Sequence, residues 1–232
     1  GLSQSGVIQA FNKHGRREML EWCDKAYDHV QELDKEFSDW LCVPRSVRTT
    51  SIKPSGTVSL LNGSTPGIHY PEAEYYIRRI RFSVGNVILK AIEEAGYHVE
   101  KDAYSPNTMV ASFPVHEPFF QKGKSEATMW EQLEIAAAYQ HYWADNSVSV
   151  TVTFNGDEAK DIKTALEMYE SRLKAVSFLR FQETGYEQAP YEPITKEQYE
   201  EMSKNITPID RIETEEQGAG TVFCDGDSCE IV

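Results

Sequence analysis

Two short stretches of the sequence carry residue types that could do chemistry. The first follows a run of β-branched residues and consists of Pro54, Ser55, Gly56, Thr57, Val58 and Ser59. Its glycine would let the backbone approach a ligand closely, and its hydroxyl groups could donate hydrogen bonds. A helix that begins near Thr57 would point free N–H groups at the same place. The stretch, named here the anion loop (residues 54–59), predicts a phosphate site; a capped connection between elements is the alternative.

The second stretch is a pair of cysteines near the end of the chain, Cys224 and Cys229. A flexible step of this length can bring two Cα atoms within the roughly 4.4–6.8 Å that a disulfide requires. No further Cys or His lies nearby to complete a zinc site. The pattern therefore indicates a dithiol that cycles with a disulfide. Its acidic neighbours disfavour the thiolate, so we expect a moderate nucleophile that a flexible segment, residues 213–223, carries to a docking site.

Other reactive residue types receive structural interpretations. Cys23 lies on the apolar stripe of a predicted helix and Cys42 lies in a turn, so both are expected to be structural. His69 lies in a loop with two prolines and two glycines, named here the proline loop (residues 62–71), and is expected to pack beside Tyr70. Three arginines lie close together at positions 78, 79 and 81. They could neutralise phosphate or pair with carboxylates, and the sequence favours neither.

Composition limits the class of protein. The chain has 232 residues and a net charge of −14, which argues against general binding to nucleic acids or anionic membranes. Thirteen acidic and three basic residues lie between 183 and 232, so a solvated tail is expected there. No apolar run is long enough to span a membrane, and four cysteines do not suggest a secreted scaffold. The sequence predicts a cytoplasmic protein. Because it opens on Gly1 in mid-pattern, we expect a C-terminal piece of something longer.

The predicted elements alternate between helices and strands. Helices are expected at residues 16–40, 86–95, 127–143 and 157–174, and from Thr195, where a capping box begins. Strands are expected at 46–52, 75–82, 97–100, 108–113, 147–154 and 176–181. The strands at 46–52 and 147–154 are each followed by a loop and a helix. This order predicts an α/β fold in which part of the sheet is missing.

Several motifs together resemble one enzyme family. They are residues 48–59 with the anion loop, residues 65–71, residues 75–78, residues 142–152, residues 186–191 and the terminal cysteine pair. The chain resembles the C-terminal part of an adenosylcobalamin-dependent (class II) ribonucleoside-triphosphate reductase. The resemblance runs over essentially the whole chain, and the first motif and the cysteine pair are its most specific parts.

The resemblance implies a fold and a set of roles. The fold would be the C-terminal portion of a ten-stranded α/β barrel, with residues 1–182 in the barrel, 183–212 in a peripheral helical segment and 213–232 in a flexible redox tail. The anion loop would hold the phosphates of a ribonucleoside triphosphate. In the family, a cysteine thiyl radical formed through adenosylcobalamin attacks the ribose. Cys224 and Cys229 would re-reduce the active site and be recharged by thioredoxin.

One departure from the family pattern matters. The family carries its radical cysteine in an Asn-x-Cys-x-Glu motif, which this sequence lacks. The radical site and most of the cobalamin site are therefore expected on an N-terminal part of the same enzyme, and the isolated chain is expected to be inactive. Two alternatives remain: the large subunit of a class I ribonucleoside-diphosphate reductase, and a non-catalytic module that binds phosphate or shuttles thiols.

Overall fold

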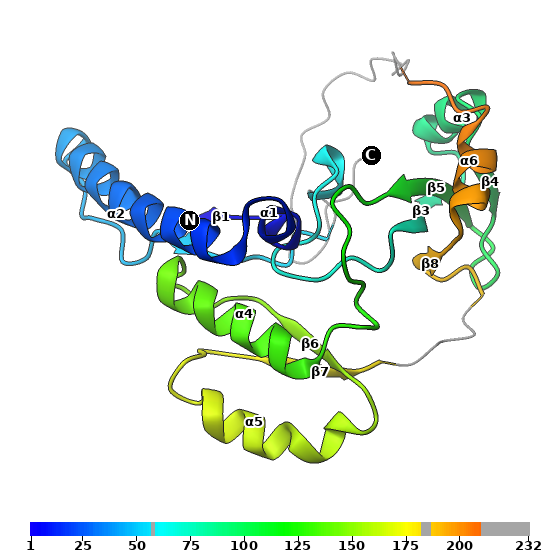
Figure 1. Cartoon of the computed structure of the whole chain (residues 1–232). Coiled ribbons are helices and arrows are strands. Elements are labelled where there is room, and N and C mark those ends of the chain that lie inside the picture. The colour runs from blue at the N-terminus through cyan, green and yellow to red at the C-terminus, as the bar shows by residue number, and fades with distance from the viewer. Residues whose placement is uncertain (57–58, 182–186, 210–232) are drawn as a thin grey trace.

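The computed structural model describes residues 1–56, 59–181 and 187–209, and it shows an α/β fold with two kinds of sheet (Figure 1). The parallel strands are β1 (Leu2–Ser3), β2 (Thr50–Ser51), β6 (Thr151–Phe154) and β7 (Ser177–Arg180). β1 pairs with β2, and β6 pairs with β7. A single parallel bridge between Ile52 and Val148 joins the two pairs. The four strands thus run in one direction.

Helices connect and cover these parallel strands. α1 (Val7–His14) and α2 (Arg16–Leu41) lead from β1 to β2, α4 (Met129–Tyr142) precedes β6, and α5 (Ile162–Tyr169) leads from β6 to β7. Two short 3-10 helices, η1 (Ser59–Asn62) and η2 (Glu158–Asp161), lie in the connections. The outer half of α2 projects from the body (Figure 1), so Trp40 and Leu41 are about 70% exposed.

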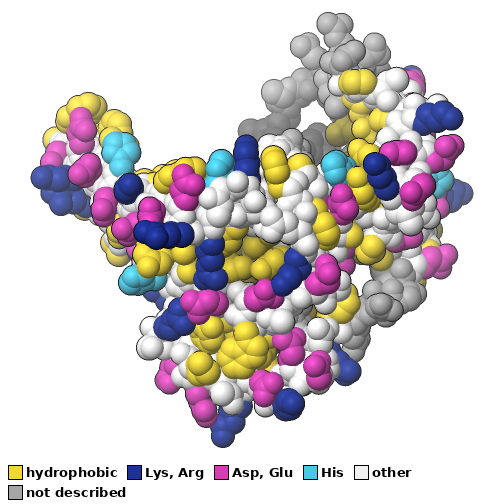
Figure 2. All heavy atoms as spheres, viewed as in Figure 1, with side chains coloured by type: hydrophobic (Ala, Val, Ile, Leu, Met, Phe, Trp, Pro, Cys, Tyr) yellow, Lys and Arg dark blue, Asp and Glu magenta, His cyan; other side chains and the backbone are white. Residues whose placement is uncertain are grey.

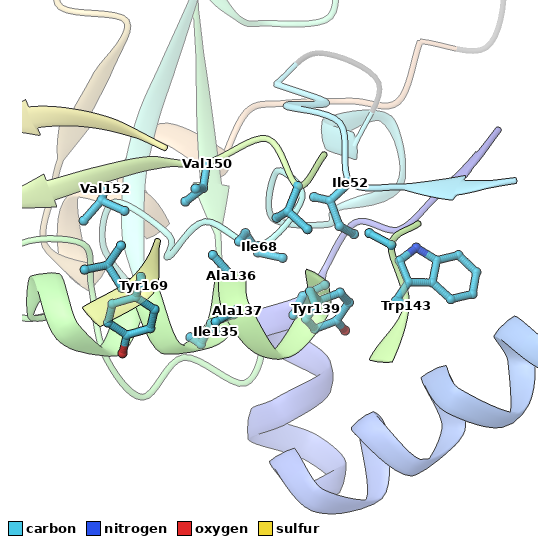
Figure 3. Close-up of a cluster of buried hydrophobic side chains, with 14 of the residues drawn as sticks. Ile52, Ile68, Ile135, Ala136, Ala137, Tyr139, Trp143, Val150, Val152 and Tyr169 are labelled. Atoms are coloured by element: carbon cyan, nitrogen blue, oxygen red, sulfur yellow. The ribbon is translucent and has the colours of Figure 1, made fainter. Parts of the chain in front are cut away.

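The main core lies between α4 and the parallel strands (Figure 3). α4 contributes eight buried residues, among them Leu133 and Tyr139, which lie in one core with Ile52, next to β2, and Val152 of β6. Each such aliphatic side chain contributes about 1.5–3 kcal/mol when it is fully buried. Hydrophobic side chains also reach the surface over α4 and α5 (Figure 2), where Leu166 and Met168 are half-exposed. The helical layer over this sheet is therefore incompletely covered.

The antiparallel sheet has the order β4–β5–β3–β8. Its strands are β3 (Tyr75–Ser83), β4 (His98–Lys101), β5 (Thr108–His116) and β8 (Tyr191–Pro193). α3 (Val87–Glu94) and α6 (Lys196–Ser203) accompany it. Tyr199 of α6 lies against Tyr75 and His116, and the backbone N–H of Thr207 donates to the carbonyl oxygen of Ala95. Both helices thus belong to this sheet, which lies to the right of the parallel strands in Figure 1.

Most predicted elements are confirmed. α2 occupies the predicted range, Cys23 is 1% exposed, and the strands expected at 97–100 and 108–113 are present as β4 and β5, which pair antiparallel. The capping box at Thr195 is present, and Gly96 follows α3 with a φ of +91°. The division of the chain at residues 182 and 212 stays a prediction, and residues 213–232 lie outside the described residues.

Two predicted strands are wrong in length. The strand expected at 46–52 is reduced to Thr50–Ser51, and the strand expected at 147–154 begins only at Thr151. The cause is that side chains take the backbone N–H groups that precede each strand. Before β2, Asp34 accepts from the N–H of Ser46 and Asp145 accepts from that of Thr49; before β6, Gln140 accepts from the N–H of Val148.

The helix predicted from Asp157 is also different. Asp157 makes no side-chain capping bond, η2 comes first, and the α-helix ends at Tyr169 rather than near Lys174. Glu158 takes the capping role instead, because its carboxylate accepts from the N–H groups of Asn155 and Met129. It thereby ties this turn to the start of α4.

Candidate functional site

The described part of the anion loop lies at the carboxyl end of β2. The N–H of Lys53 donates to Oγ of Ser3, at the end of β1, over 2.9 Å. The N–H of Ser149 donates to the carbonyl oxygen of Ile52, also over 2.9 Å. The loop therefore begins where three parallel segments meet. In open α/β sheets this edge is where ligands bind.

A tight turn shapes the loop. Ser55 has a φ of +50°, and its carbonyl oxygen accepts from both the N–H and the hydroxyl of Ser59. A Cβ built on Gly56 would meet nothing within 4 Å, so this glycine borders open space. Among the described residues of the loop, the left-handed one is thus Ser55, while Gly56 leaves the backbone accessible. Thr57 and Val58 lie outside the described residues.

The helix expected near Thr57 is replaced by η1, a 3-10 helix of four residues. The N–H of Ser64 donates to the carbonyl oxygen of Ser59 over 3.0 Å, and Gly63 has a φ of +69°. This turn ends the helix after one turn. The described residues 59–62 therefore form no helix dipole of useful length, and an anion would have to be bound by hydroxyl and N–H groups.

The proline loop packs behind the anion loop. Gly67 has a φ of +50°, and a Cβ at this position would lie 2.7 Å from the carbonyl oxygen of Lys53. α1 holds the same loop from the other side, because the N–H groups of Gly6 and Val7 donate to the carbonyl oxygens of Thr65 and Gly67. The position of the anion loop thus depends on this close backbone contact.

His69 fastens the proline loop to β6. Its Nδ1 lies 3.1 Å from the carbonyl oxygen of Pro66, and its Nε2 accepts from the N–H of Thr151 over 3.2 Å. Burial lowers the pKa of His69 below its ordinary value. The neutral imidazole with its proton on Nδ1 satisfies both contacts. His69 is thus a structural residue, as expected, although its contacts are backbone groups.

A pocket of about 260 Å³ opens beside Pro54. Its lining residues are Pro54, Thr65, Pro66, His69, Tyr70, Pro71, Glu72, Tyr76, Lys124, Gln132, Thr151, Thr153 and Tyr191. A second cavity of about 360 Å³ lies along Ile52, Lys53 and Pro54 and the segment 146–150. Pro54 lines both cavities, so the anion loop begins at the edge of both.

The three arginines are occupied within the antiparallel sheet. Arg79 pairs with Glu192, and Arg81 pairs with Asp102 over 2.7 Å. The guanidinium of Arg78 lies 4.4 Å from the centre of the Tyr191 ring. The structure therefore supports pairing with carboxylates and an aromatic ring rather than a role as free phosphate ligands.

Sequence reasoning missed two carboxylates near the loops. Asp145 accepts from the N–H groups of Thr49 and Thr50 and thereby fixes the start of β2; despite desolvation, these hydrogen bonds lower its pKa. Glu117 is 4% exposed, and burial raises its pKa to about 7. Asp145 lies within residues 142–152, one of the motifs that carry the resemblance, but no role was assigned to it there. Glu117 lies outside those motifs, so no local signal in the sequence could have identified it.

Several predicted site residues cannot be placed. Cys224 and Cys229 lie outside the described residues. Cys23 is buried beside the Tyr139 hydroxyl, and Cys42 is exposed; neither forms a disulfide within the described part of the chain. Across residues 1–56, 59–181 and 187–209, no cluster of His, Cys, Asp and Glu could hold a metal ion. No helix in the same ranges is long and apolar enough to cross a membrane.

Comparisons with known proteins connect this chain to one family. No protein-family model matches the chain. It is 41% identical over 239 residues to a probable adenosylcobalamin-dependent ribonucleoside-triphosphate reductase of Dictyostelium discoideum, covering 100% of this chain and 32% of that protein. It is also 41% identical to the enzyme of that name from Euglena gracilis, covering 99% of this chain and 33% of that protein.

The fold gives the same result. A crystal structure of a B12-dependent (class II) ribonucleotide reductase superposes with a TM-score of 0.83 at 31% identity, covering 90% of this chain and 33% of that one. The predicted α/β fold, a portion of the reductase barrel, is thus confirmed. The chain spans about one third of the length of these relatives. Sequence identity along the whole chain and a shared fold show that it belongs to the family of class II ribonucleotide reductases, as about one third of such a protein.

Proposed function

We propose that this chain is the substrate-phosphate part of an adenosylcobalamin-dependent ribonucleoside-triphosphate reductase. The observation that carries the proposal is the position of the anion loop at the carboxyl ends of the parallel strands, with open space at Gly56. Hydroxyl and N–H groups there suit phosphate oxygens. The names of the relatives supply the substrate class, a ribonucleoside triphosphate.

The second part of the proposal concerns Cys224 and Cys229. A thiol of this pair would attack an active-site disulfide, and the second thiol would resolve the mixed disulfide. The active site would gain two thiols, and the tail would become a disulfide. A dithiol protein such as thioredoxin would then reduce the tail. The acidic neighbours of the pair are consistent with an attack that depends on docking.

Adenosylcobalamin, the cofactor named for the relatives, supplies the radical chemistry of such enzymes when it is bound. The cavities described beside the anion loop measure about 260 and 360 Å³. One volume lies below and the other near the lower end of the range of about 300–1,000 Å³ for drug-sized ligands, so the described residues around these cavities do not enclose a corrin. The cofactor site is therefore proposed to lie mostly on the N-terminal part of the enzyme. A cytoplasmic location also remains a prediction.

The alternatives make different predictions. A class I reductase would act without adenosylcobalamin, and the cofactor named for the relatives disfavours it. A free-standing binding module would require that the chain alone unfold cooperatively and bind nucleotide tightly. Stimulation of the complete reductase by adenosylcobalamin separates the first alternative from the proposal, and lack of stimulation would reject the class II assignment.

The phosphate role is tested by Gly56→Val in the complete reductase. Because the space at Gly56 is open, the larger side chain fits the ligand-free fold and obstructs only an incoming phosphate. The KM for a ribonucleoside triphosphate should rise about tenfold or more, with an unchanged Tm. An unchanged KM would contradict the phosphate role.

The shuttle role is tested by Cys224→Ser and Cys229→Ser in the same enzyme. Each should abolish multiple turnovers with thioredoxin and leave a single turnover nearly intact, because only re-reduction requires the pair. Equal loss of both activities would show that the cysteines act elsewhere.

A further inference from the structure

Glu117 is a buried carboxyl group without a role in the proposed function. It follows β5, and its side chain is almost fully enclosed. Its backbone N–H donates to the carbonyl oxygen of Glu74, which fixes its position at the end of the antiparallel sheet. Its side chain contacts the amide of Gln9, on α1. Enclosing a carboxyl group is costly, so this contact calls for a physical reason.

The orientation of the Gln9 amide is determined by the proline loop. Its Nε2 donates to the carbonyl oxygen of Gly63 over 2.9 Å, and its Oε1 accepts from the N–H of Thr65 over 3.3 Å. If the amide were flipped, its oxygen would face the carbonyl oxygen of Gly63, and its NH2 group would face the N–H of Thr65, so neither hydrogen bond could form. The remaining N–H of Nε2 must therefore point at Glu117, which accepts it.

The hydrogen bonds continue from the proline loop into the anion loop. Between Gly63 and Thr65, the N–H of Ser64 donates to the carbonyl oxygen of Ser59 over 3.0 Å. The N–H of Ser59 in turn donates to the carbonyl oxygen of Ser55 over 3.2 Å, and the Ser59 hydroxyl donates to the same oxygen. A continuous path thus connects the antiparallel sheet to the turn that shapes the anion loop.

We propose that Glu117 is a positioning residue for the anion loop, acting through Gln9 on residues 59–65. The proposal rests on the proposed function for the statement that this loop binds substrate phosphates. Its structural part, that the acceptor at position 117 determines the order of residues 59–65, is independent of the ligand.

The charge of Glu117 adds a dependence on pH. Burial raises its pKa to about 7, so it ionises near neutrality. The charge of Glu117 helps to raise the pKa of Tyr76 on β3. The groups that face Glu117 from α1 and the proline loop, Gln9, Gly63 and Thr65, are uncharged. An ionised acceptor forms the stronger hydrogen bond to the Gln9 amide. The anion loop should therefore be better ordered above pH 7 than below it.

Two substitutions at position 117 distinguish the effect of the hydrogen-bond acceptor from the effect of filling the space with a side chain. Glu117→Gln keeps an acceptor oxygen and removes the titration, whereas Glu117→Leu removes the acceptor and leaves an N–H of Gln9 unpaired. In the complete reductase, Glu117→Leu should accelerate hydrogen exchange of the peptide at 59–65. It should also raise the KM for a ribonucleoside triphosphate about three- to tenfold, as loss of one buried hydrogen bond would. Below pH 7, where the wild-type carboxyl group is also mostly uncharged, Glu117→Gln should match the wild type in both.

The pH profile gives a second readout. The ratio of the KM of Glu117→Gln to that of the wild type should change as pH passes through about 7. Titration of the substrate phosphates affects both proteins equally and cancels in this ratio. A ratio independent of pH would contradict the role of the charge.

Asn12→Leu is the matched control, because it removes a different hydrogen bond between α1 and the same segment, from Nδ2 to the carbonyl oxygen of Phe119. It should leave exchange at 59–65 unchanged. The inference is overturned if Glu117→Leu also leaves that exchange unchanged, or if Glu117→Gln is as damaging as Glu117→Leu. If exchange responds as expected but Gly56→Val does not affect the KM, the proposed phosphate role fails and the positioning role stands.

Discussion

Gly67 is the residue whose backbone brings the proline loop against Lys53, the residue that precedes the anion loop. A Cβ there would lie 2.7 Å from the carbonyl oxygen of Lys53, in a left-handed conformation that L side chains avoid. Gly67→Ala should therefore lower the free energy of unfolding by about 2–4 kcal/mol, from strain and forced displacement together. Gly63→Ala is the matched control, since Gly63 has a similar φ but nothing within 4 Å. Equal losses in urea titrations would show that the contact with Lys53 is unimportant.

His69 makes the stability depend on pH in a defined direction. Its pKa in the folded protein is lowered by burial, so between this value and about 6.5 the unfolded chain binds more protons. The contribution of His69 is thus complete above pH 6.5 and is lost as pH falls through the folded pKa. As pH falls from 8 to 5, the free energy of unfolding should decrease less for His69→Gln than for the wild type, measured by urea titration at each pH. Parallel curves would contradict this. Glu117 acts in the opposite direction but is common to both proteins.

The sequence predicted the position of the anion loop after a strand better than its conformation. A serine- and glycine-rich loop after a strand could be recognised from its residue types, and the structure places it at the carboxyl end of β2. The left-handed residue, however, is Ser55, since its carbonyl oxygen is held by two donors from Ser59. Glu117 could not be found, because its role depends on Gln9, 108 positions away in the sequence.

At the scale of elements, helix caps were predictable where donor and acceptor are close in sequence. The capping box at Thr195 is an example, whereas the start of β2 depends on Asp34 and Asp145, which lie 12 and 96 positions from the residues they bind, and could not be predicted. α4 begins with another capping box, Thr128 and Glu131, which also pairs with Lys122 over 2.7 Å. This cap supports the helix that contributes most to the main core.

Removal of these two caps should have different consequences. Thr128→Ala should lower the global free energy of unfolding by about 1 kcal/mol, the usual effect of a lost cap, because α4 holds eight buried residues. Thr195→Ala is the matched change on α6, which has no buried residue, and should accelerate hydrogen exchange only in that helix. The idea fails if both changes shift the urea midpoint equally.

At the scale of the whole molecule, the two sheets have separate hydrophobic cores. The main core contains residues of α4 and the parallel strands, whereas Tyr76, Ile77, Leu89, Ile92 and Val110 are buried in the antiparallel part and lie outside it. The connections named between the two parts, such as Glu117 to Gln9, are polar. Such an arrangement predicts two units that can open separately.

Val110 and Val152 provide a matched test of this independence, since both are fully buried strand valines, one in each core. Val110→Ala and Val152→Ala should each cost roughly 2 kcal/mol by leaving a cavity. Native-state hydrogen exchange should show the loss for Val110→Ala only in β3, β4 and β5, and the loss for Val152→Ala only in α4, β6 and β7. Acceleration throughout both units by either substitution would mean that the sheets open together. Glu117 would then lie within one cooperative unit and would not link two units that open separately.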